Sequence, residues 1–144
     1  LTLAPDSAWT ASLHDPNLAS TVVMVRYGAV RLLLTGDAEG AEEEWLLRQK
    51  VPLRADILKA GHHGSATSTT TAFLDAVAPR VALVSVGAAN GYGHPSAAVM
   101  AELRTRGTTV LRTDQLGSIV LPSWALPRRS VKHRRLDAEH MPCR

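Results

Sequence analysis

The sequence predicts an α/β protein in which helices cover a sheet. Short β-branched runs alternate with helical segments, which predicts this class. Apolar residues reach 45% and charged residues 20% of the chain, the composition of an ordinary globular protein. At 144 residues the chain is long enough to bury one core. Because aromatic residues make up only 4%, that core is expected to be aliphatic.

The first predicted elements form a hairpin. Residues 1–20 lack periodicity and are expected to be an entry loop. The apolar runs "TVVMVRY" (21–27) and "VRLLLTG" (30–36) follow, separated by "GA", which is typical of two strands joined by a tight turn.

Strands and helices then alternate. Residues 37–50 are acidic in the first half and basic in the last turn, which suits the dipole of a helix. We expect short buried strands at 55–61 and 80–87, with a loop and a helix over 65–79 between them.

The remaining expected elements are a helix over 94–107, closed by Gly107, and strands at 108–114 and 117–122 around a "QLG" turn. Residues 122–144 carry six Lys or Arg against two acidic residues, whereas the whole chain has a net charge of +3. This tail is expected to be disordered, with contact to nucleic acid or an anionic surface as the alternative.

Composition excludes several classes. No apolar run approaches the roughly 20 residues that span a bilayer. The single cysteine, Cys143, excludes an internal disulfide framework and a thiolate metal cluster. A first residue of Leu rather than Met is expected of a fragment or a processed chain.

Polar side chains follow three of the predicted strands. Asp37 follows an aliphatic strand in "LLLTGDAE", His62 and His63 follow "DILKAG", and His94 follows a glycine-rich turn in "NGYGHPS". A carboxylate and imidazoles at strand ends are ligands that zinc or manganese accepts. Ser65 or Thr67 would then orient those ligands.

Each of these residues also has a simpler interpretation. Asp37 suits the N-cap of the helix expected from Ala38, and a His-His pair in a loop is commonly solvated. His94 suits the start of a helix as well as a ligand or phosphate contact.

Four motifs, in order, carry a family resemblance. They are "AVRLLLTGDAE" (29–39), "ADILKAGHHGS" (55–65), "PRVALVSVGAANGYGHPS" (79–96) and "VLRTDQLGSIVL" (110–121). Over residues 16–121 the chain resembles the C-terminal metallo-β-lactamase-fold domain of the ComEC family of DNA-uptake competence proteins. The resemblance implies the second half of an αββα sandwich, with residues 21–121 as this half-domain.

The resemblance also implies roles for individual residues. Asp37 would contact both metal ions and act in catalysis, and one residue of the His62-His63 pair would be a ligand, with His62 favoured. The other would lie against metal or substrate phosphate. His94 would be catalytic, contacting the phosphate or leaving group, with Ser65 beside the substrate. Asp114 falls at a further motif, with a structural or a catalytic role.

One motif of such hydrolases, H-x-H/D-x-D-H, does not occur in the chain. The complete domain would be a metal-dependent phosphodiesterase or nuclease with two zinc or manganese ions, acting on DNA at the outer face of a membrane protein. Asp37 with the histidines cannot hold both ions, so the chain alone is expected to be inactive, with a sheet face uncovered.

Two other functions stay open at this point. One is a metal-free DNA-binding or assembly module that uses basic residues of the tail, namely Arg128, Arg129, Lys132, Arg134 and Arg135. The other is a metallo-β-lactamase-fold hydrolase acting on a different phosphoester or ester, because fold alone does not choose a substrate.

Overall fold

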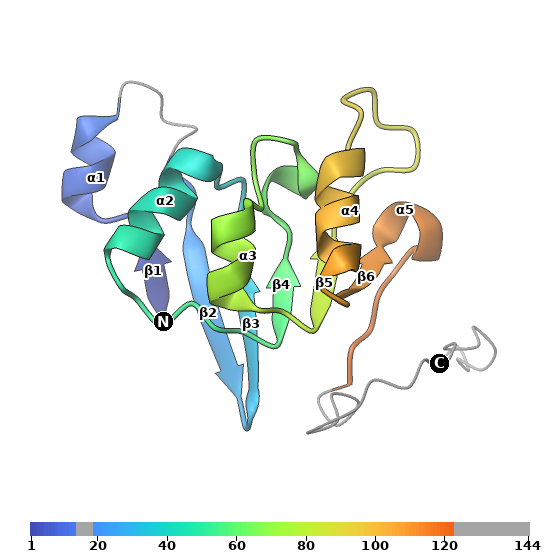
Figure 1. Ribbon diagram of the computed structural model, residues 1–144, viewed down its shortest axis with the longest axis horizontal. Helices are drawn as coiled ribbons and strands as arrows, with labels where there is room; N and C mark the ends of the chain where they lie inside the picture. The colour runs from blue at the N-terminus through green and yellow to red at the C-terminus, as the bar shows by residue number, and fades with distance from the viewer. Residues whose placement is uncertain (14–18, 123–144) are drawn as a thin grey trace, which may run out of the picture.

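The computed structural model describes residues 1–13 and 19–122, which form a six-stranded sheet flanked by helices (Figure 1). The strands are β1 (Thr2–Ala4), β2 (Val22–Tyr27), β3 (Val30–Leu34), β4 (Ile57–Lys59), β5 (Val81–Val84) and β6 (Thr109–Arg112). The helices are α1 (Ser7–Ser12), α2 (Gly40–Arg48), α3 (Thr71–Val77), α4 (Ala97–Thr105) and α5 (Thr113–Leu116), with a 3-10 turn, η2 (Gly61–Gly64). The predicted α/β class is confirmed.

The sheet is mixed, and its strands lie side by side in chain order. β1, β2 and β3 pair antiparallel, whereas β3, β4, β5 and β6 pair parallel. Because the parallel strands share one direction, the loops that follow β3, β4 and β5 emerge at the same edge. These loops contain the polar residues that the sequence places at strand ends.

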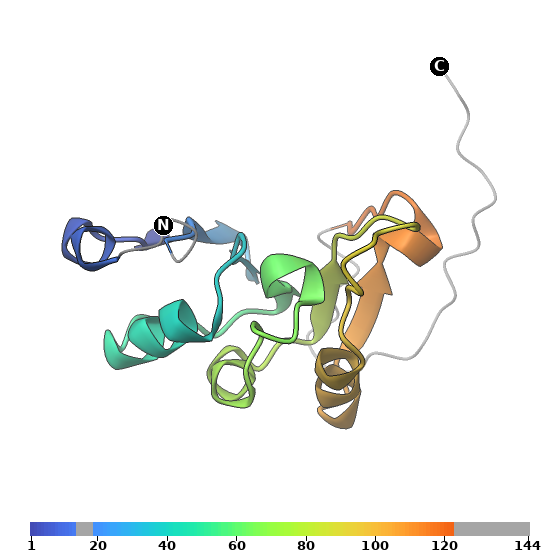
Figure 2. The same cartoon turned by 90° about the horizontal axis from the view of Figure 1, so that it is seen from above.

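Helices α2, α3 and α4 lie together against one face of the sheet (Figure 2). The core between helices and sheet is mainly aliphatic, as composition predicts. Its largest fully buried apolar side chains are Met24, Leu33, Leu46, Leu58, Phe73, Leu74 and Leu103. The packing of these side chains holds the helices against the sheet.

The opposite face of the sheet is also apolar. Alternation along the paired strands puts one cross-strand row on this face, consisting of Val23, Leu34, Lys59, Leu83 and Leu111. All five side chains are partly exposed, and none belongs to the buried core. The three helices α2, α3 and α4 all lie over the other face (Figure 2).

The prediction of an entry loop over residues 1–20 is wrong for its first part. β1 pairs with β2, and the Leu1 amino group donates to the Met24 carbonyl at 2.9 Å. Asp6 caps α1 by accepting from the Trp9 N–H at 2.6 Å, and the Trp9 and Trp45 rings lie 5.5 Å apart. Elements this short show no periodicity, and their stability comes from tertiary contacts.

The C-terminal strand expected at 117–122 is also absent from the described part of the chain, and the "QLG" turn belongs to α5. Thr113 ends the sheet here because its hydroxyl donates to the Val86 carbonyl at 2.8 Å and accepts from the Val86 N–H at 2.8 Å. The tail beyond Pro122, with its predicted disorder and DNA contact, lies outside the described residues. No described helix is long and apolar enough to cross a membrane.

Candidate functional site

Three loops meet at the carboxyl edge of the parallel strands. The His62 N–H donates to the Gly36 carbonyl at 3.2 Å, and the Ser96 N–H donates to the Gly64 carbonyl at 2.8 Å. Gly64 admits this contact, because a Cβ there would stand 2.7 Å from the Pro95 Cβ. The structure therefore brings the three predicted segments together.

The N-cap interpretation of Asp37 is wrong. Helix α2 begins at Gly40 with Glu39 at its N-cap, and the Asp37 side chain remains 54% exposed. The Asp37 N–H donates to the Ser20 hydroxyl at 3.0 Å, which holds the loop. The carboxylate is thus directed to the edge where the histidines lie.

The histidine pair has an unusual backbone. His62 (φ 43°, ψ 49°) and His63 (φ 56°, ψ 21°) both adopt the left-handed conformation. This conformation costs roughly 1–2 kcal/mol per residue for side chains other than glycine. Such strain persists where surrounding contacts hold it, and it clusters at functional sites. This geometry favours a functional role over a solvated loop.

His63 faces Asp37. Its Nδ1 lies 2.6 Å from the Ser85 carbonyl, and since a carbonyl only accepts, Nδ1 carries the proton. Nε2 of a neutral ring then presents its lone pair, and it lies 3.6 Å from Oδ1 of Asp37. A carboxylate oxygen and an oriented imidazole nitrogen thus converge on one point.

His62 faces a different carboxylate. Its Nδ1 lies 2.9 Å from Oε1 of Glu39, and the Thr67 hydroxyl donates to the same oxygen at 2.8 Å. Ser65 is 6% exposed, and its hydroxyl pairs with that of Thr67 at 2.9 Å. Ser65 therefore supports Thr67 and Glu39 rather than lying open to a substrate.

Lys59 adds a cation to the site. Its ammonium donates to the Gly36 carbonyl and lies 3.7 Å from Oδ1 of Asp37. Burial lowers the pKa of Lys59, and the charge of Asp37 and its hydrogen bond oppose that shift. Sequence reasoning missed Lys59 and Glu39, although a lysine inside the apolar run "DILKAG" was a signal.

His94 lies on a loop closed by Asn90, outside α4, whose N-cap is Ser96. Oδ1 of Asn90 accepts from the His94 N–H at 3.1 Å, and Nδ2 donates to the His94 carbonyl at 2.8 Å. The His94 ring is 5.5 Å from that of His62 and 6.1 Å from that of Tyr92. His94 therefore belongs to the same cluster as the histidine pair.

Asp114 is engaged in an ion pair. Arg112 donates to both carboxylate oxygens of Asp114, with Nε at 3.0 Å from Oδ1. The hydrogen bond from Arg112 lowers the pKa of Asp114, and the same pairing raises the pKa of Arg112. This geometry favours the structural role over the catalytic one.

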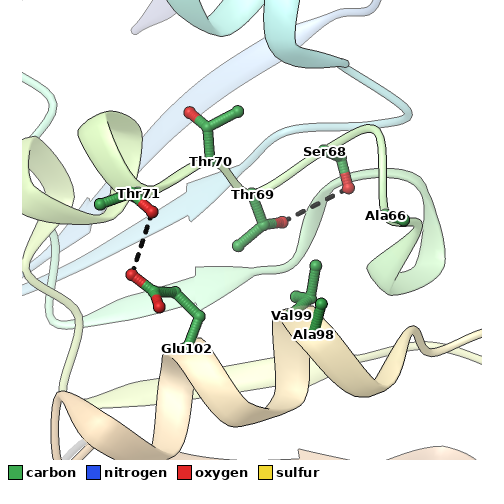
Figure 3. Close-up of a pocket in the computed structure, with 8 residues that line it drawn as sticks. All are labelled: Ala66, Ser68, Thr69, Thr70, Thr71, Ala98, Val99 and Glu102. Carbon is green, nitrogen blue, oxygen red and sulfur yellow. Dashed lines mark hydrogen bonds between the residues drawn. The ribbon is translucent and has the colours of Figure 1, made fainter.

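A cavity near these loops is separate from the site. It has a volume of about 210 Å³ and lies between residues 66–71 and α4 (Figure 3). The Thr71 hydroxyl donates to Oε1 of Glu102 across it at 3.1 Å. None of Asp37, Glu39 and the histidines lines this cavity, so it is distinct from the histidine cluster.

Asp37 and His63 could provide two ligands of a metal site, but they do not make a complete set of ligands. Oδ1 of Asp37 and Nε2 of His63 are suitable ligands for zinc or manganese. Among residues 1–13 and 19–122, however, no group of three or more His, Cys, Asp or Glu side chains is arranged to hold an ion. The described residues thus supply part of a coordination sphere.

Two glutamates of α2 are buried, which the sequence did not predict. Glu42 and Glu43 are both 0% exposed. Oε2 of Glu42 accepts from the Ser20 N–H at 2.9 Å, and Oε1 of Glu42 has no hydrogen-bond partner. Since Ser20 also bonds Asp37, Glu42 supports the Asp37 loop from inside the core.

Burial of Glu42 predicts a pH-dependent stability. Desolvation raises the pKa of Glu42 from 4.5 to about 7, although the Ser20 N–H opposes the shift and the charge of Glu43 adds to it. The folded state therefore binds the proton more tightly, and stability falls as pH rises from about 4.5 through about 7. Glu42→Gln is expected to flatten this fall and to stabilise the fold above pH 7 by about 1–2 kcal/mol, allowing for solvent screening.

Urea unfolding of the domain at about pH 5 and pH 8 measures this effect. Glu44→Gln on the same helix is the control: Glu44 is 68% exposed, so its replacement is expected to change stability by under about 0.5 kcal/mol. Equal pH profiles for wild type and Glu42→Gln would show that Glu42 does not carry the effect.

The profile of the metallo-beta-lactamase superfamily matches residues 10–88, which is more than half of the chain. The chain belongs to this superfamily, whose members generally bind divalent metals. The mixed sheet with helices on one face agrees with such a domain.

The curated relatives are more specific. Competence protein ComA of Neisseria gonorrhoeae is 42% identical over 123 residues, covering 85% of this chain and 17% of the relative. ComE operon protein 3 of Bacillus subtilis is 38% identical over 116 residues (81% and 14%). Recombination protein 2 of Haemophilus influenzae is 38% identical over 103 residues (72% and 13%). The chain thus spans 13–17% of the length of these relatives, and the predicted likeness to competence proteins is confirmed.

Proposed function

We propose that this chain is the Asp37- and His63-bearing part of a metal-dependent phosphodiesterase or nuclease domain that processes DNA during uptake. The observation that carries the proposal is the approach of His63 Nε2 to Asp37 Oδ1 at 3.6 Å, with the ring oriented by the Ser85 carbonyl. Membership of the superfamily and similarity to competence proteins support it. In the whole protein, the domain would act at the outer face of a membrane.

Asp37 and His63 would hold zinc or manganese, with two ions in the complete domain. Their remaining ligands would come from an H-x-H/D-x-D-H motif, which this sequence does not contain and which another part of the parent protein would supply. When bound, the metal would polarise the phosphate and lower the pKa of a water molecule, so that the water can attack at neutral pH. We propose His63 rather than His62 as the ligand, because His63 is the ring whose Nε2 lies beside Asp37.

The other side chains would act on the substrate. Glu39 keeps the His62 proton on Nδ1, which leaves Nε2 of His62 directed away from Glu39. His94, 5.5 Å from His62, would contact the phosphate or the leaving group. Lys59 places an ammonium 3.7 Å from Oδ1 of Asp37, where it would also attract the phosphate.

This assignment predicts different phenotypes for the two histidines. His63→Ala is expected to weaken metal binding by at least about 10–100-fold. His62→Ala is expected to keep the metal and to lower kcat by about 100-fold or more, because it removes a group that acts on substrate. Metal content by mass spectrometry, measured beside kcat, separates the two effects, and a loss of metal confined to His62→Ala would reverse the assignment.

Cleavage assays test the function as a whole. The domain, including the residues that precede this chain in its parent protein, is incubated with Mn²⁺ or Zn²⁺ and single- or double-stranded DNA. Cleavage that chelation abolishes supports the proposal. Hydrolysis of small phosphoesters without cleavage of DNA would favour another hydrolase of the superfamily.

A further inference from the structure

We propose that Tyr92 is a stacking platform for a nucleobase beside the scissile phosphate, so that the site takes single-stranded nucleic acid. The inference rests on the proposed phosphodiesterase function and adds the part of the substrate that is recognised. Its basis is an exposed aromatic ring at the open end of the histidine cluster.

Tyr92 is the most exposed of the large apolar side chains of the described residues, at 85%. An exposed ring is notable in a chain with only six aromatic residues in total. The Tyr92 ring contributes little to the buried core, so it can contact a ligand from solvent.

The rings form a row that leads from solvent to Asp37. Tyr92 and His94 are nearly parallel, with centroids 6.1 Å apart and 17° between their planes. The His94 ring lies 5.5 Å from His62, which lies 6.2 Å from His63. One face of Tyr92 thus packs toward His94, while the other is available for a base.

The loop is held before any ligand arrives. The Asn90 side chain bonds both the N–H and the carbonyl of His94, and its Nδ2 also donates to the Gly87 carbonyl at 3.1 Å. Gly93 provides the positive φ of 73° that the turn between Tyr92 and His94 needs. Because this loop is ordered, stacking on Tyr92 loses less conformational entropy than stacking on a free segment.

Single-stranded nucleic acid is the ligand this chemistry favours. A base in a duplex is already stacked, whereas an unpaired base offers a π-face to an aromatic side chain. Imidazoles and the Lys59 ammonium near Asp37 suit the phosphate that follows the base. The row therefore recognises a base and a phosphate together.

Binding measurements on the intact protein test the proposal. An oligothymidylate and a strand of the same length with abasic sites are compared for wild type, Tyr92→Ala, Tyr92→Trp and Tyr27→Ala. Tyr27 is the matched control: it is 73% exposed, ends β2 and pairs with Val30 at the start of β3, whereas Asp37 follows the other end of β3. Figure 1 shows these two ends of the β2–β3 hairpin.

Tyr92→Ala is expected to weaken oligothymidylate binding by about 5- to 150-fold and to leave the abasic strand unchanged. Tyr92→Trp is expected to retain binding, and Tyr27→Ala to change neither ligand. Equal losses for both strands in Tyr92→Ala, or no loss, would overturn the proposal.

Photocross-linking separates this inference from the proposed function. An oligonucleotide with 5-iodouracil is irradiated on the protein, and the cross-linked peptide is identified by mass spectrometry. A cross-link at Tyr92 supports the stacking contact even where no metal-dependent cleavage is found, an outcome that would contradict the nuclease proposal alone. Cross-links confined to other segments would overturn the stacking contact and leave the nuclease proposal standing.

Discussion

Replacing Asp37 with asparagine is expected to lower metal-dependent phosphodiester cleavage by at least about 1,000-fold. Oδ1 of Asp37 lies 3.6 Å from Nε2 of His63 and 3.7 Å from the Lys59 ammonium. An amide of the same size keeps the shape but loses the charge that would hold a divalent ion. Initial cleavage rates over a range of Mn²⁺ and Zn²⁺ concentrations measure the loss.

The same substitution should leave the fold intact. The Asp37 side chain is 54% exposed, and the loop is held by its backbone N–H on Ser20, which asparagine retains. Stability is expected to fall by about 1 kcal/mol or less, because Lys59 loses its ion-pair partner but keeps its hydrogen bond to the Gly36 carbonyl. Asp75→Asn is the matched control, because Asp75 is a 69% exposed aspartate that pairs with Arg106 on the helical layer. A variant at Asp37 that cleaves as fast as the Asp75 control would exclude Asp37 as a ligand.

The carboxyl edge of the sheet was predictable because each of its polar groups follows an apolar strand. Asp37, the histidine pair and His94 come from strands β3, β4 and β5, and parallel pairing alone brings their ends together. Local sequence therefore sufficed to place these residues at one edge.

The choice between His62 and His63 depends on information that local sequence does not carry. Both residues lie in the left-handed conformation, so the ring directions follow from the turn and not from strand alternation. The acceptor that orients His63 is Ser85, which lies 22 positions further along the chain. Likewise the burial of Ser65 comes from its pairing with Thr67 and from tertiary packing.

The acidic start of helix α2 is a second feature that depends on tertiary contacts and not on local sequence. Three consecutive glutamates lie in the acidic first half that suits the helix dipole, and a glutamate is ordinarily exposed to solvent. Glu44 follows this expectation, whereas Glu42 and Glu43 are fully buried because backbone N–H groups from distant loops require an acceptor. Helical periodicity indicates which positions face the core. It does not indicate which buried N–H groups will need a side-chain acceptor there.

Glu43→Ala is expected to destabilise the fold by roughly 2–6 kcal/mol, the largest stability loss proposed for a single polar side chain of this protein. Oε1 of Glu43 accepts from the Thr69 N–H at 2.6 Å, and Oε2 accepts from the Thr70 N–H at 2.8 Å. Alanine leaves both donors without this acceptor, the Thr69 N–H in a buried position and the Thr70 N–H in a half-buried one. Urea unfolding measures the loss, with Glu44→Ala as the exposed control on the same helix.

The loss should extend to the site. Thr69 has a positive φ of 58°, and its hydroxyl accepts from the Gly61 N–H at 3.2 Å, so Glu43 holds the segment that supports the turn of His62 and His63. Burial raises the pKa of Glu43, and the N–H groups of Thr69 and Thr70 oppose the shift. The ionised form is the one that accepts from both, so Glu43→Gln, with one acceptor oxygen, is expected to lose about half as much stability as alanine. If Glu43→Ala unfolds at the same urea concentration as Glu44→Ala, the two hydrogen bonds contribute nothing to stability, and the other contacts of the turn, such as those from Ser68 and Gly36, hold it without Glu43.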